Sequence, residues 1–390
     1  MPLTALVLAV ALSQSAPAEP ALSQPPAPPA AEAPRPPPSP PATQGPTLPV
    51  PFRKAVTFYG FIDAQYSRTQ VPGPADDSAT FELRRARIGA RGEVTPNVGF
   101  NLLFDGADTS LKDAYVALTK VGLLPGIEVR LGQWKVPFGY EQLESDTKLL
   151  WVNSSYAVAA LSRSTATTSL FANGDSRDLG AGLFGSWSSG AVGAELATSV
   201  VNGAGPNRRD DLDGKNFWGR AGATAKAGGA LVRAGGSFGY GRQVAGLGAN
   251  GKFDGVSTPT DDTYFWFKTY GGDVEVDHPY FFAAAELIQS ERDVTAYTTT
   301  TAASKTAFTA RGWYAGIYGK TPWKLGPVFR AERYDRNLSV GDNTNERYTV
   351  GAYVDGLPVN ARLIFNYELD QSDASVKTGN RAILFGQVVY

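Results

Sequence analysis

The sequence predicts an all-β fold, namely a transmembrane antiparallel up-and-down β-barrel of about 16 strands that follows a Pro-rich disordered segment. Three observations support this prediction. After residue 51, apolar and polar residues alternate with a period of two along most of the chain. Long and short links alternate between these segments, as an up-and-down barrel in a membrane requires. The chain also contains 43 Gly, 17 Tyr, 20 Phe and 7 Trp, a composition typical of β-rich walls.

The first 51 residues are expected to lie outside the barrel. Residues 1–18 are predicted to be a signal peptide, because the apolar run 3–12 is too short for a spanning helix of about 20 residues. Ala16-Pro17-Ala18 then offers small residues for cleavage. Residues 19–51 contain 14 prolines, which predicts an extended periplasmic linker that either contacts the cell wall or has no partner.

Residues 52–390 are predicted to form the barrel, and the strands are recognised by their alternation. In residues 56–67 one parity is apolar, and the other ends in Asp63, Gln65 and Ser67. The same pattern marks residues 97–105, 126–134, 179–187, 232–240, 348–354 and 359–369. The apolar parity is expected to face lipid, and the polar parity, with Arg, Asp, Asn, Thr and Gln, a wet lumen. The final strand, 381–390, ends on an aromatic residue and resembles the assembly signal of bacterial outer-membrane barrels.

The links between these segments predict the topology. Short turns are expected at residues 93–96, 121–125, 189–190, 228–229, 278–279, 322–326 and 356–358. Long links are expected at residues 68–79, 105–111, 135–175, 203–216, 243–262, 291–305, 336–346 and 372–380. Sixteen strands result, and both chain ends then lie on one side of the membrane. Aromatic girdles at the two membrane interfaces are expected to include Tyr264, Phe265, Trp266, Phe267, Trp313, Trp323 and Tyr390.

The composition argues against several classes of function. With 36 Lys and Arg against 37 Asp and Glu, the net charge of −1 gives no global attraction for nucleic acid. Because the chain has no Cys and one His, disulfides, thiolate zinc sites and cysteine nucleophiles are excluded, and no metal or cofactor is expected. Residues 235–239 match G-x-S-x-G, but inside an alternating strand rather than at a strand-to-helix turn. The sequence therefore predicts no enzyme, and a secreted β-rich binding protein or a carboxylate-based barrel enzyme remain alternatives.

Inward-facing arginines are the strongest candidates for a functional site. If Ala86 and Ile88 face lipid, then Arg85, Arg87 and Arg91 share the lumen face at alternate positions. A permeating anion could then pass from one guanidinium to the next. The same parity places these further arginines inward: Arg130, Arg220, Arg347, Arg362 and Arg381. The alternative is that carboxylates across the wall pair with these arginines, which then only keep the lumen wet.

Three stretches resemble a known family. LRRARIGARGEV (83–94), LLFDGAD with LKDAYVAL (102–108 and 111–118) and RLGQWKVPFGYE (130–141) are similar to the phosphate-selective porin O and P family. The resemblance implies an anion-selective homotrimeric channel of sixteen strands in the outer membrane of a Gram-negative bacterium. In that family, inward arginines guide phosphate or polyphosphate to a constriction formed with an infolded loop.

The resemblance also implies roles for particular residues. The link 135–175 would be the infolded loop, Lys135 would stand at the base of the constriction, and Asp105 would face Lys135. The anion pathway would thus comprise Arg85, Arg87, Arg91, Arg130, Lys135 and Asp105. The loop itself carries Lys148 and Arg163 as bases against four carboxylates. A non-selective general diffusion channel therefore remains the alternative to a channel for small anions such as phosphate.

Overall fold

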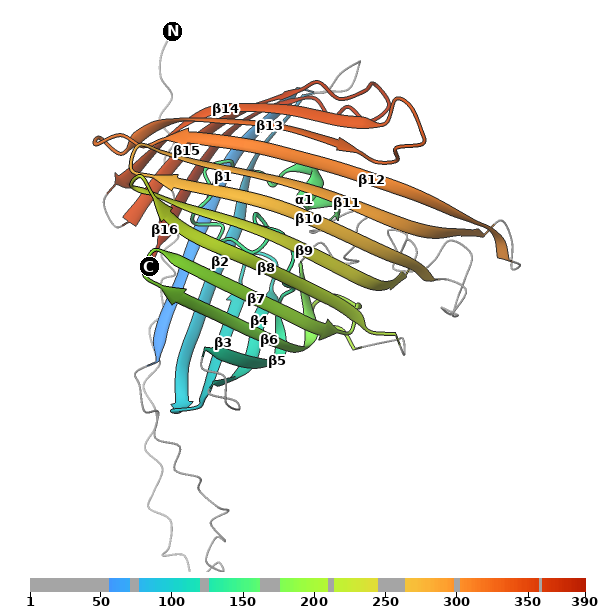
Figure 1. Ribbon diagram of the computed structural model, residues 1–390. Helices are drawn as coiled ribbons and strands as arrows, with labels where there is room; N and C mark the ends of the chain where they lie inside the picture. The colour runs from blue at the N-terminus through green and yellow to red at the C-terminus, as the bar shows by residue number, and fades with distance from the viewer. Residues whose placement is uncertain are drawn as a thin grey trace, which may run out of the picture. The chain divides into compact units, whose positions relative to one another are not determined.

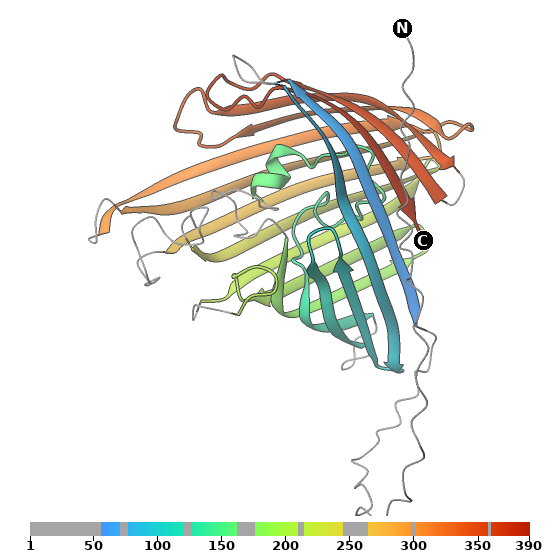
Figure 2. The same ribbon diagram turned by 180° about the vertical axis from the view of Figure 1, so that it is seen from behind.

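A computed structural model of the chain describes residues 56–70, 77–119, 126–161, 176–209, 214–244, 264–297, 302–357 and 360–390. Sixteen antiparallel strands form one closed barrel in which each strand pairs with its neighbours in sequence (Figures 1 and 2). The expected number of strands and the up-and-down order are thus confirmed. The proposed signal peptide at 1–18 and linker at 19–51 lie outside the described residues.

The strands differ in length by more than twofold. Their bounds are β1 Thr57–Gln70, β2 Ser78–Thr95, β3 Val98–Asp105, β4 Ser110–Thr119, β5 Ile127–Lys135, β6 Arg177–Ser189, β7 Val192–Val201 and β8 Asn216–Ala227. The second half comprises β9 Ala230–Val244, β10 Tyr264–His278, β11 Phe281–Tyr297, β12 Ala302–Gly319, β13 Leu325–Asp335, β14 Thr344–Leu357, β15 Ala361–Asp370 and β16 Asn380–Val389. The helix α1, Tyr156–Leu161, lies between β5 and β6. No helix in the described part of the chain is long and apolar enough to cross a membrane.

The last strand closes the barrel against the first. β1 and β16 pair from Phe61↔Val389 to Gln70↔Asn380. Beyond this ladder, the Gly60 and Tyr390 backbones exchange two hydrogen bonds of 3.0 and 3.1 Å. A Cβ atom on Gly60 would lie 2.2 Å from the carbonyl oxygen of Arg87 and 2.7 Å from the Tyr390 ring. Closure therefore requires glycine at position 60, because any side chain there would clash with backbone.

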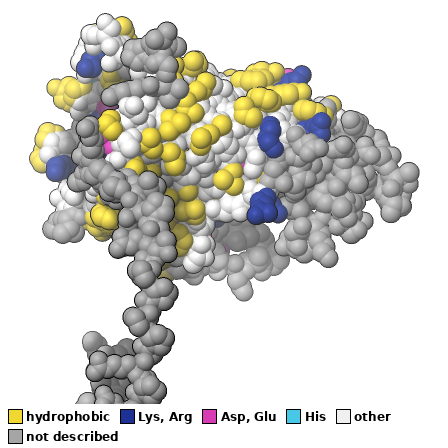
Figure 3. All heavy atoms as spheres, turned by 90° about the horizontal axis from the view of Figure 1, so that it is seen from below, with side chains coloured by type: hydrophobic (Ala, Val, Ile, Leu, Met, Phe, Trp, Pro, Cys, Tyr) yellow, Lys and Arg dark blue, Asp and Glu magenta, His cyan; other side chains and the backbone are white. Residues whose placement is uncertain are grey.

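The outer face is apolar, as the alternation predicted. Side chains such as Leu102, Leu183 and Leu384 are about half exposed on the wall. Figure 3 shows hydrophobic side chains spread over one face of the barrel, with separate patches of Lys and Arg. Trp313, Trp323 and Tyr390 are exposed as expected for girdles, but Phe267 is 1% exposed and faces inward. The prediction for Phe267 was wrong because side chains alternate between the two faces of β10, and at this point Trp266 faces outward and Phe267 inward.

One predicted link is mostly strand. Residues 291–305 were expected to form a long loop, but β11 continues to Tyr297 and β12 begins at Ala302. The two strands pair up to Thr295↔Lys305, with an irregularity before Tyr297↔Ala302. These residues are mostly polar, and neither parity is consistently apolar, so the hairpin extends beyond the apolar band without a visible period of two. We refer to the end of the barrel with the long links as the long-loop end and to the other as the short-turn end.

The inward face is polar only in part. The strands β8 to β16 also turn large apolar side chains inward, including Trp218, Phe282, Ile288, Tyr314 and Ile364, all 2% exposed or less. The expectation of a polar inward parity on every strand was therefore wrong for this part of the wall. The physical reason is that these side chains pack against a segment of chain inside the barrel rather than facing water.

Candidate functional site

Residues 136–161, which we call the inner segment, run inside the barrel from the end of β5 to the end of α1. The segment packs against the apolar inward side chains of the wall. The Phe138 ring lies 5.6 Å from the Trp218 ring, and the Trp151 ring lies 6.1 to 6.3 Å from Phe282, Tyr314 and Tyr318. The remaining residues of this link, 162–175 with Arg163 and Asp175, lie outside the described part of the chain.

The beginning of the inner segment is held by a buried carboxylate. Glu286 of β11 accepts hydrogen bonds from the backbone N–H groups of Tyr140 and Glu141 at 3.2 and 3.1 Å. Ser237 Oγ accepts a third, from the Gly139 N–H at 2.9 Å. Gly139 has φ of +71°, and a Cβ there would lie 2.3 Å from the Glu286 carboxylate. Glycine is therefore needed where the chain passes over Glu286.

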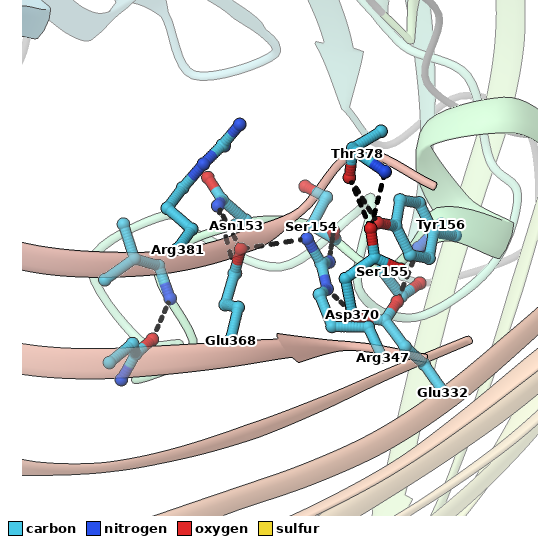
Figure 4. A network of polar contacts seen from close by, with 12 residues as sticks. Asn153, Ser154, Ser155, Tyr156, Glu332, Arg347, Glu368, Asp370, Thr378 and Arg381 are labelled. Atoms are coloured by element: carbon cyan, nitrogen blue, oxygen red, sulfur yellow. Dashed lines mark hydrogen bonds and ion pairs between the residues drawn. The ribbon is translucent and has the colours of Figure 1, made fainter. Parts of the chain in front are cut away.

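The end of the inner segment is held by a network of buried ions (Figure 4). Arg330 and Arg347 donate to the carbonyl oxygens of Asn153 and Ser154, both at 2.8 Å. Glu332 lies between these two guanidinium groups and accepts a hydrogen bond from the Tyr156 N–H at 2.6 Å. These side chains come from β13 and β14, so the wall and the segment share one set of charges. Sequence parity placed Arg347 inward but gave no sign of its partners on the loop.

The middle of the inner segment is joined to the predicted arginine cluster. The Asp146 carboxylate lies 3.1 Å from Arg85 and 2.7 Å from Arg87. Arg85 also pairs with Asp63 at 3.1 Å, and Arg87 pairs with Asp105 at 2.9 Å. The Arg85 and Arg87 side chains are only 15% and 10% exposed. Both arginines therefore lie on the lumen face but position the inner segment instead of standing free in water.

A β-bulge in β2 adds an arginine that parity counting missed. Asp63 pairs with Arg85 and Ala64 pairs with Leu83, so Arg84 is an extra residue in the ladder. Its guanidinium donates to the side-chain oxygens of Gln65 and Asn153, both at 2.9 Å. Arg84 therefore reaches inward although its neighbour Arg85 also does. A bulge is the way in which two consecutive residues can face the same side of a strand.

The other predicted site residues lie in three places. Arg91 is exposed on the lumen face near the short-turn end, with its guanidinium 5.3 Å from the Tyr59 ring. Arg130 lies over the Phe184 ring at 3.9 Å and pairs with Glu128. Lys135 donates to the carbonyl oxygen of Glu144 at 2.8 Å.

Asp105 is almost fully buried beside the arginines of β2. It is 2% exposed and accepts hydrogen bonds from Arg87 and from the backbone N–H groups of Ala86 and Ala107. The structure thus brings Asp105 together with Arg85 and Arg87 through shared ion pairs. Arg91 and Arg130 lie farther toward the short-turn end, where the lumen is open.

The open part of the lumen is a cavity of about 590 Å³ between the inner segment and the strands β5 to β10. Its charged lining residues are the bases Arg130, Lys148, Arg220 and Arg233 and the acids Glu128, Glu144, Glu195 and Glu275. Every base pairs with an acid, as Arg233 does with Glu275 at 2.7 Å and Arg220 with Glu195 at 3.2 Å. The cavity lining is therefore polar and balanced in charge.

The opposite wall carries several inward arginines, of which Arg85 and Arg87 are paired with carboxylates. On the inward faces of β16, β1 and β2, which we call the arginine wall, there are five arginines (Arg381, Arg84, Arg85, Arg87, Arg91) and three carboxylates (Asp63, Glu82, Glu93). Within the described residues, Arg84, Arg91 and Arg381 have no carboxylate within ion-pair distance. Arg381 instead donates to Thr69 Oγ1 at 3.1 Å.

The lining offers no metal site within the described residues, since no group of three His, Asp or Glu side chains is placed to bind an ion. Burial, together with the nearby Glu144 and Glu275 carboxylates, raises the pKa of Tyr140 above its ordinary value. The phenol therefore stays neutral where it lines the cavity.

The comparison with family models decides the classification. Residues 57–325 match the model described as phosphate-selective porin O and P. The chain belongs to this family of porins. No curated protein matches the sequence.

Several solved structures share the fold of this chain at low sequence identity. The anion-selective porin from Comamonas acidovorans matches with a TM-score of 0.57 and 13% identity, over 86% of this chain and 99% of that chain. Pseudomonas putida OprB matches with a TM-score of 0.58 and 10% sequence identity, over 86% of this chain and 94% of that chain. The trimer form of Vibrio cholerae OmpT, folded in vitro, matches with a TM-score of 0.51 and 12% sequence identity, over 86% of this chain and 99% of that chain.

Family and fold together establish the general role of the protein. This porin is an outer-membrane channel for small solutes, and it is embedded in the lipid of a Gram-negative outer membrane. The apolar outer wall and the polar cavity are the physical counterparts of that role.

Proposed function

We propose that the porin is a passive channel through which small anions, including phosphate, diffuse along the arginine wall. The observation that carries this proposal is that the inward Arg381, Arg84 and Arg91 of β16 and β2 have no carboxylate within ion-pair distance in the described residues. Arg381, Arg84 and Arg91 occupy three depths of that wall, because they lie near the levels of Thr69, Ala64 and Thr57 of β1. A permeating anion would meet a positive field at each depth. No catalytic step or cofactor is part of the proposal.

Arg85 and Arg87 take a different role here from the one expected from sequence alone. Since Asp63, Asp105 and Asp146 are their partners, their charge is largely neutralised. We assign to them the positioning of the inner segment, and we assign guidance of anions mainly to Arg91 and Arg381. Arg130 lines the open cavity and Lys135 donates to the Glu144 carbonyl oxygen of the inner segment, and we assign both to the same pathway.

A non-selective diffusion channel is the second candidate, and the balanced lining of the cavity favours it. Ion pairs around a wet cavity attract neither sign of charge over long distances. The two candidates differ in one measurable quantity, the ratio of chloride to potassium permeability.

Assembly and export are part of the proposal. We propose residues 1–18 as a signal peptide, 19–51 as a periplasmic linker able to contact the cell wall, and 135–175 as the loop that narrows the pore. A homotrimer is proposed on the resemblance to the family and on the fold shared with the trimer form of Vibrio cholerae OmpT.

The zero-current potential in a planar bilayer under a KCl gradient tests this function. The wild-type channel is expected to prefer chloride, and Arg91→Ala is expected to lower the chloride-to-potassium permeability ratio about twofold. Arg68→Ala is the matched control, because Arg68 lies on the outer face and pairs with Asp77. Inorganic phosphate is then expected to reduce the chloride current.

A wild-type potential near zero or of cation-selective sign would overturn the anion channel in favour of the non-selective one. Absence of conductance steps from protein that is folded in the bilayer would overturn both.

A further inference from the structure

Four basic side chains point outward from β9, β10, β12 and β13 at the long-loop end of the barrel. Arg242 of β9 lies with its guanidinium 4.5 Å from the Trp266 ring, which is stacked on Tyr240. Lys268 of β10 is exposed and faces outward, because its neighbours Phe267 and Thr269 are buried and face inward.

The other two bases follow on β12 and β13. Arg311 is exposed and donates to Gln289 Oε1 at 2.9 and 2.6 Å. Arg333 is 53% exposed and lies opposite Trp313 in the ladder. These four residues, Arg242, Lys268, Arg311 and Arg333, form what we call the outer basic stripe.

The depth of the stripe matches the outer boundary of the membrane. The four bases lie eight to twelve residues from the short-turn ends of their strands. A tilted strand needs roughly 9 to 11 residues to cross the hydrocarbon layer. Long links of outer-membrane barrels face outward from the cell. The stripe therefore lies where the head groups of the outer leaflet begin.

The stripe is confined to one side of the barrel. On β5 and β6 the outward parity ends in Lys135 and Arg177, but Lys135 donates to the Glu144 carbonyl oxygen and Arg177 pairs with Asp113 at 2.7 Å. On β1 the outward Arg68 already pairs with Asp77 at 3.2 Å. A girdle that served only to set the depth of the barrel would have no reason to concentrate bases on one side of it.

Two bases of the stripe have spare capacity for a ligand. Lys268 has no carboxylate within ion-pair distance in the described residues, and Arg311 uses two of its five N–H donors on an uncharged amide. Arg333 is 3.9 Å from Glu346, a loose pair. Three outward acids stand opposite bases of the stripe, Glu291 opposite Lys268, Asp335 opposite Arg311 and Glu346 opposite Arg333, so the four bases exceed the acids by one charge.

We propose that the outer basic stripe binds the phosphate groups of lipopolysaccharide in the outer leaflet. Guanidinium and ammonium groups at head-group depth recognise phosphate through charge-assisted hydrogen bonds. The aromatic rings beside them, Tyr240, Trp266 and Trp313, suit the same interfacial layer. The acyl chains would lie on the apolar wall below, along side chains such as Leu287 and Ile317.

Native mass spectrometry of the full chain in detergent tests this proposal, with bisphosphorylated lipid A and its dephosphorylated form as probes. The wild-type protein is expected to bind the bisphosphorylated form about tenfold more tightly. Lys268→Gln combined with Arg311→Gln is expected to remove that preference. Arg68→Gln, at the same depth on β1, is expected to keep it.

Channel conductance in a bilayer shows that each variant is folded, because neither Lys268 nor Arg311 faces the lumen. Equal binding of the two lipids by the wild-type protein would overturn the proposal, as would an unchanged preference in the double variant. If the double variant does not assemble, Lys268→Gln alone is measured, and a preference equal to wild type again counts against the proposal. The result is independent of whether the channel prefers anions.

Discussion

The two sides of the lumen are built differently. On the packed side, β11 to β15, inward side chains such as Ile288 and Tyr314 are fully buried against the inner segment. On the open side, β5 to β9, inward residues such as Arg130, Glu195 and Arg233 line a wet cavity. Both sides obey the same alternation, yet one behaves like the core of a soluble protein and the other like a pore.

The difference shows that a barrel wall does not by itself decide what its inward face meets. The inner segment covers the packed side with apolar rings. Its backbone groups there form hydrogen bonds with the side chains of Arg330, Arg347 and Glu332. Where the segment does not reach, the wall keeps ion pairs that remain partly exposed, such as Arg233 with Glu275. The position of one loop therefore divides the lumen into a core and a passage.

The largest effect is expected from removing the central ring of the packed side. Trp151→Ala empties a site that is 2% exposed and is expected to lower the free energy of unfolding by about 3–5 kcal/mol. Urea unfolding in lipid vesicles, followed by the fluorescence of the remaining tryptophans, measures this change. Trp323→Ala is the control, since its side chain is 82% exposed, and it is expected to cost about 1 kcal/mol or less. Similar losses for the two variants would contradict the existence of a packed core in the lumen.

An intermediate effect is expected where the inner segment meets the arginine wall. Asp146→Asn leaves Arg85 with Asp63 and Arg87 with Asp105, but it removes the carboxylate that both share. The chloride-to-potassium permeability ratio is expected to rise about twofold, because positive charge is uncovered beside the lumen. Asp77→Asn on the outer face serves as the control. An unchanged ratio would show that Arg85 and Arg87 are too far from the passage to influence ions.

The smallest effect is expected on the open side. The Glu195 side chain is 53% exposed beside Arg220, so Glu195→Gln is expected to change stability by about 1 kcal/mol or less. The permeability ratio is expected to shift toward chloride by less than in Asp146→Asn, and the shift should vanish near 1 M KCl, where the screening length is about 3 Å. Glu346→Gln, which faces outward, is the control. A shift that persisted at high salt would indicate direct ion binding rather than a screened field.

Much of the wall could be predicted from the sequence, because lipid imposes the same requirement on every strand. The period of two gave the outward residues, such as Ile62, Leu131 and Phe365, and the links gave the number of strands. The hairpin at 291–305 escaped detection because strands beyond the membrane have no apolar face.

The lumen could be predicted only in part. Parity placed Arg85 and Arg347 inward, but their partners Asp146 and Ser154 belong to a loop whose path has no periodic signal. Apolar residues in that loop, such as Trp151, were the one available sign that some inward wall positions would be dry. Arg84 was missed because parity counting assumes a regular ladder, and the bulge breaks it.

The same bulge bears on how this lumen can change in evolution. If the ladder of β1 and β2 continued regularly from Asp63↔Arg85 with no bulge, Arg84 would stand opposite Ala64, on the lipid side of the wall. Deletion of Arg84 would join Leu83 to Arg85, restore an uninterrupted ladder and leave Phe81, Leu83 and Arg85 on their present faces. Gain or loss of a single codon at this point would therefore change the charge of the lumen by one without moving any neighbouring side chain to the other face of the strand. Substitution at a lipid-facing position could not add a charge to the lumen in this way.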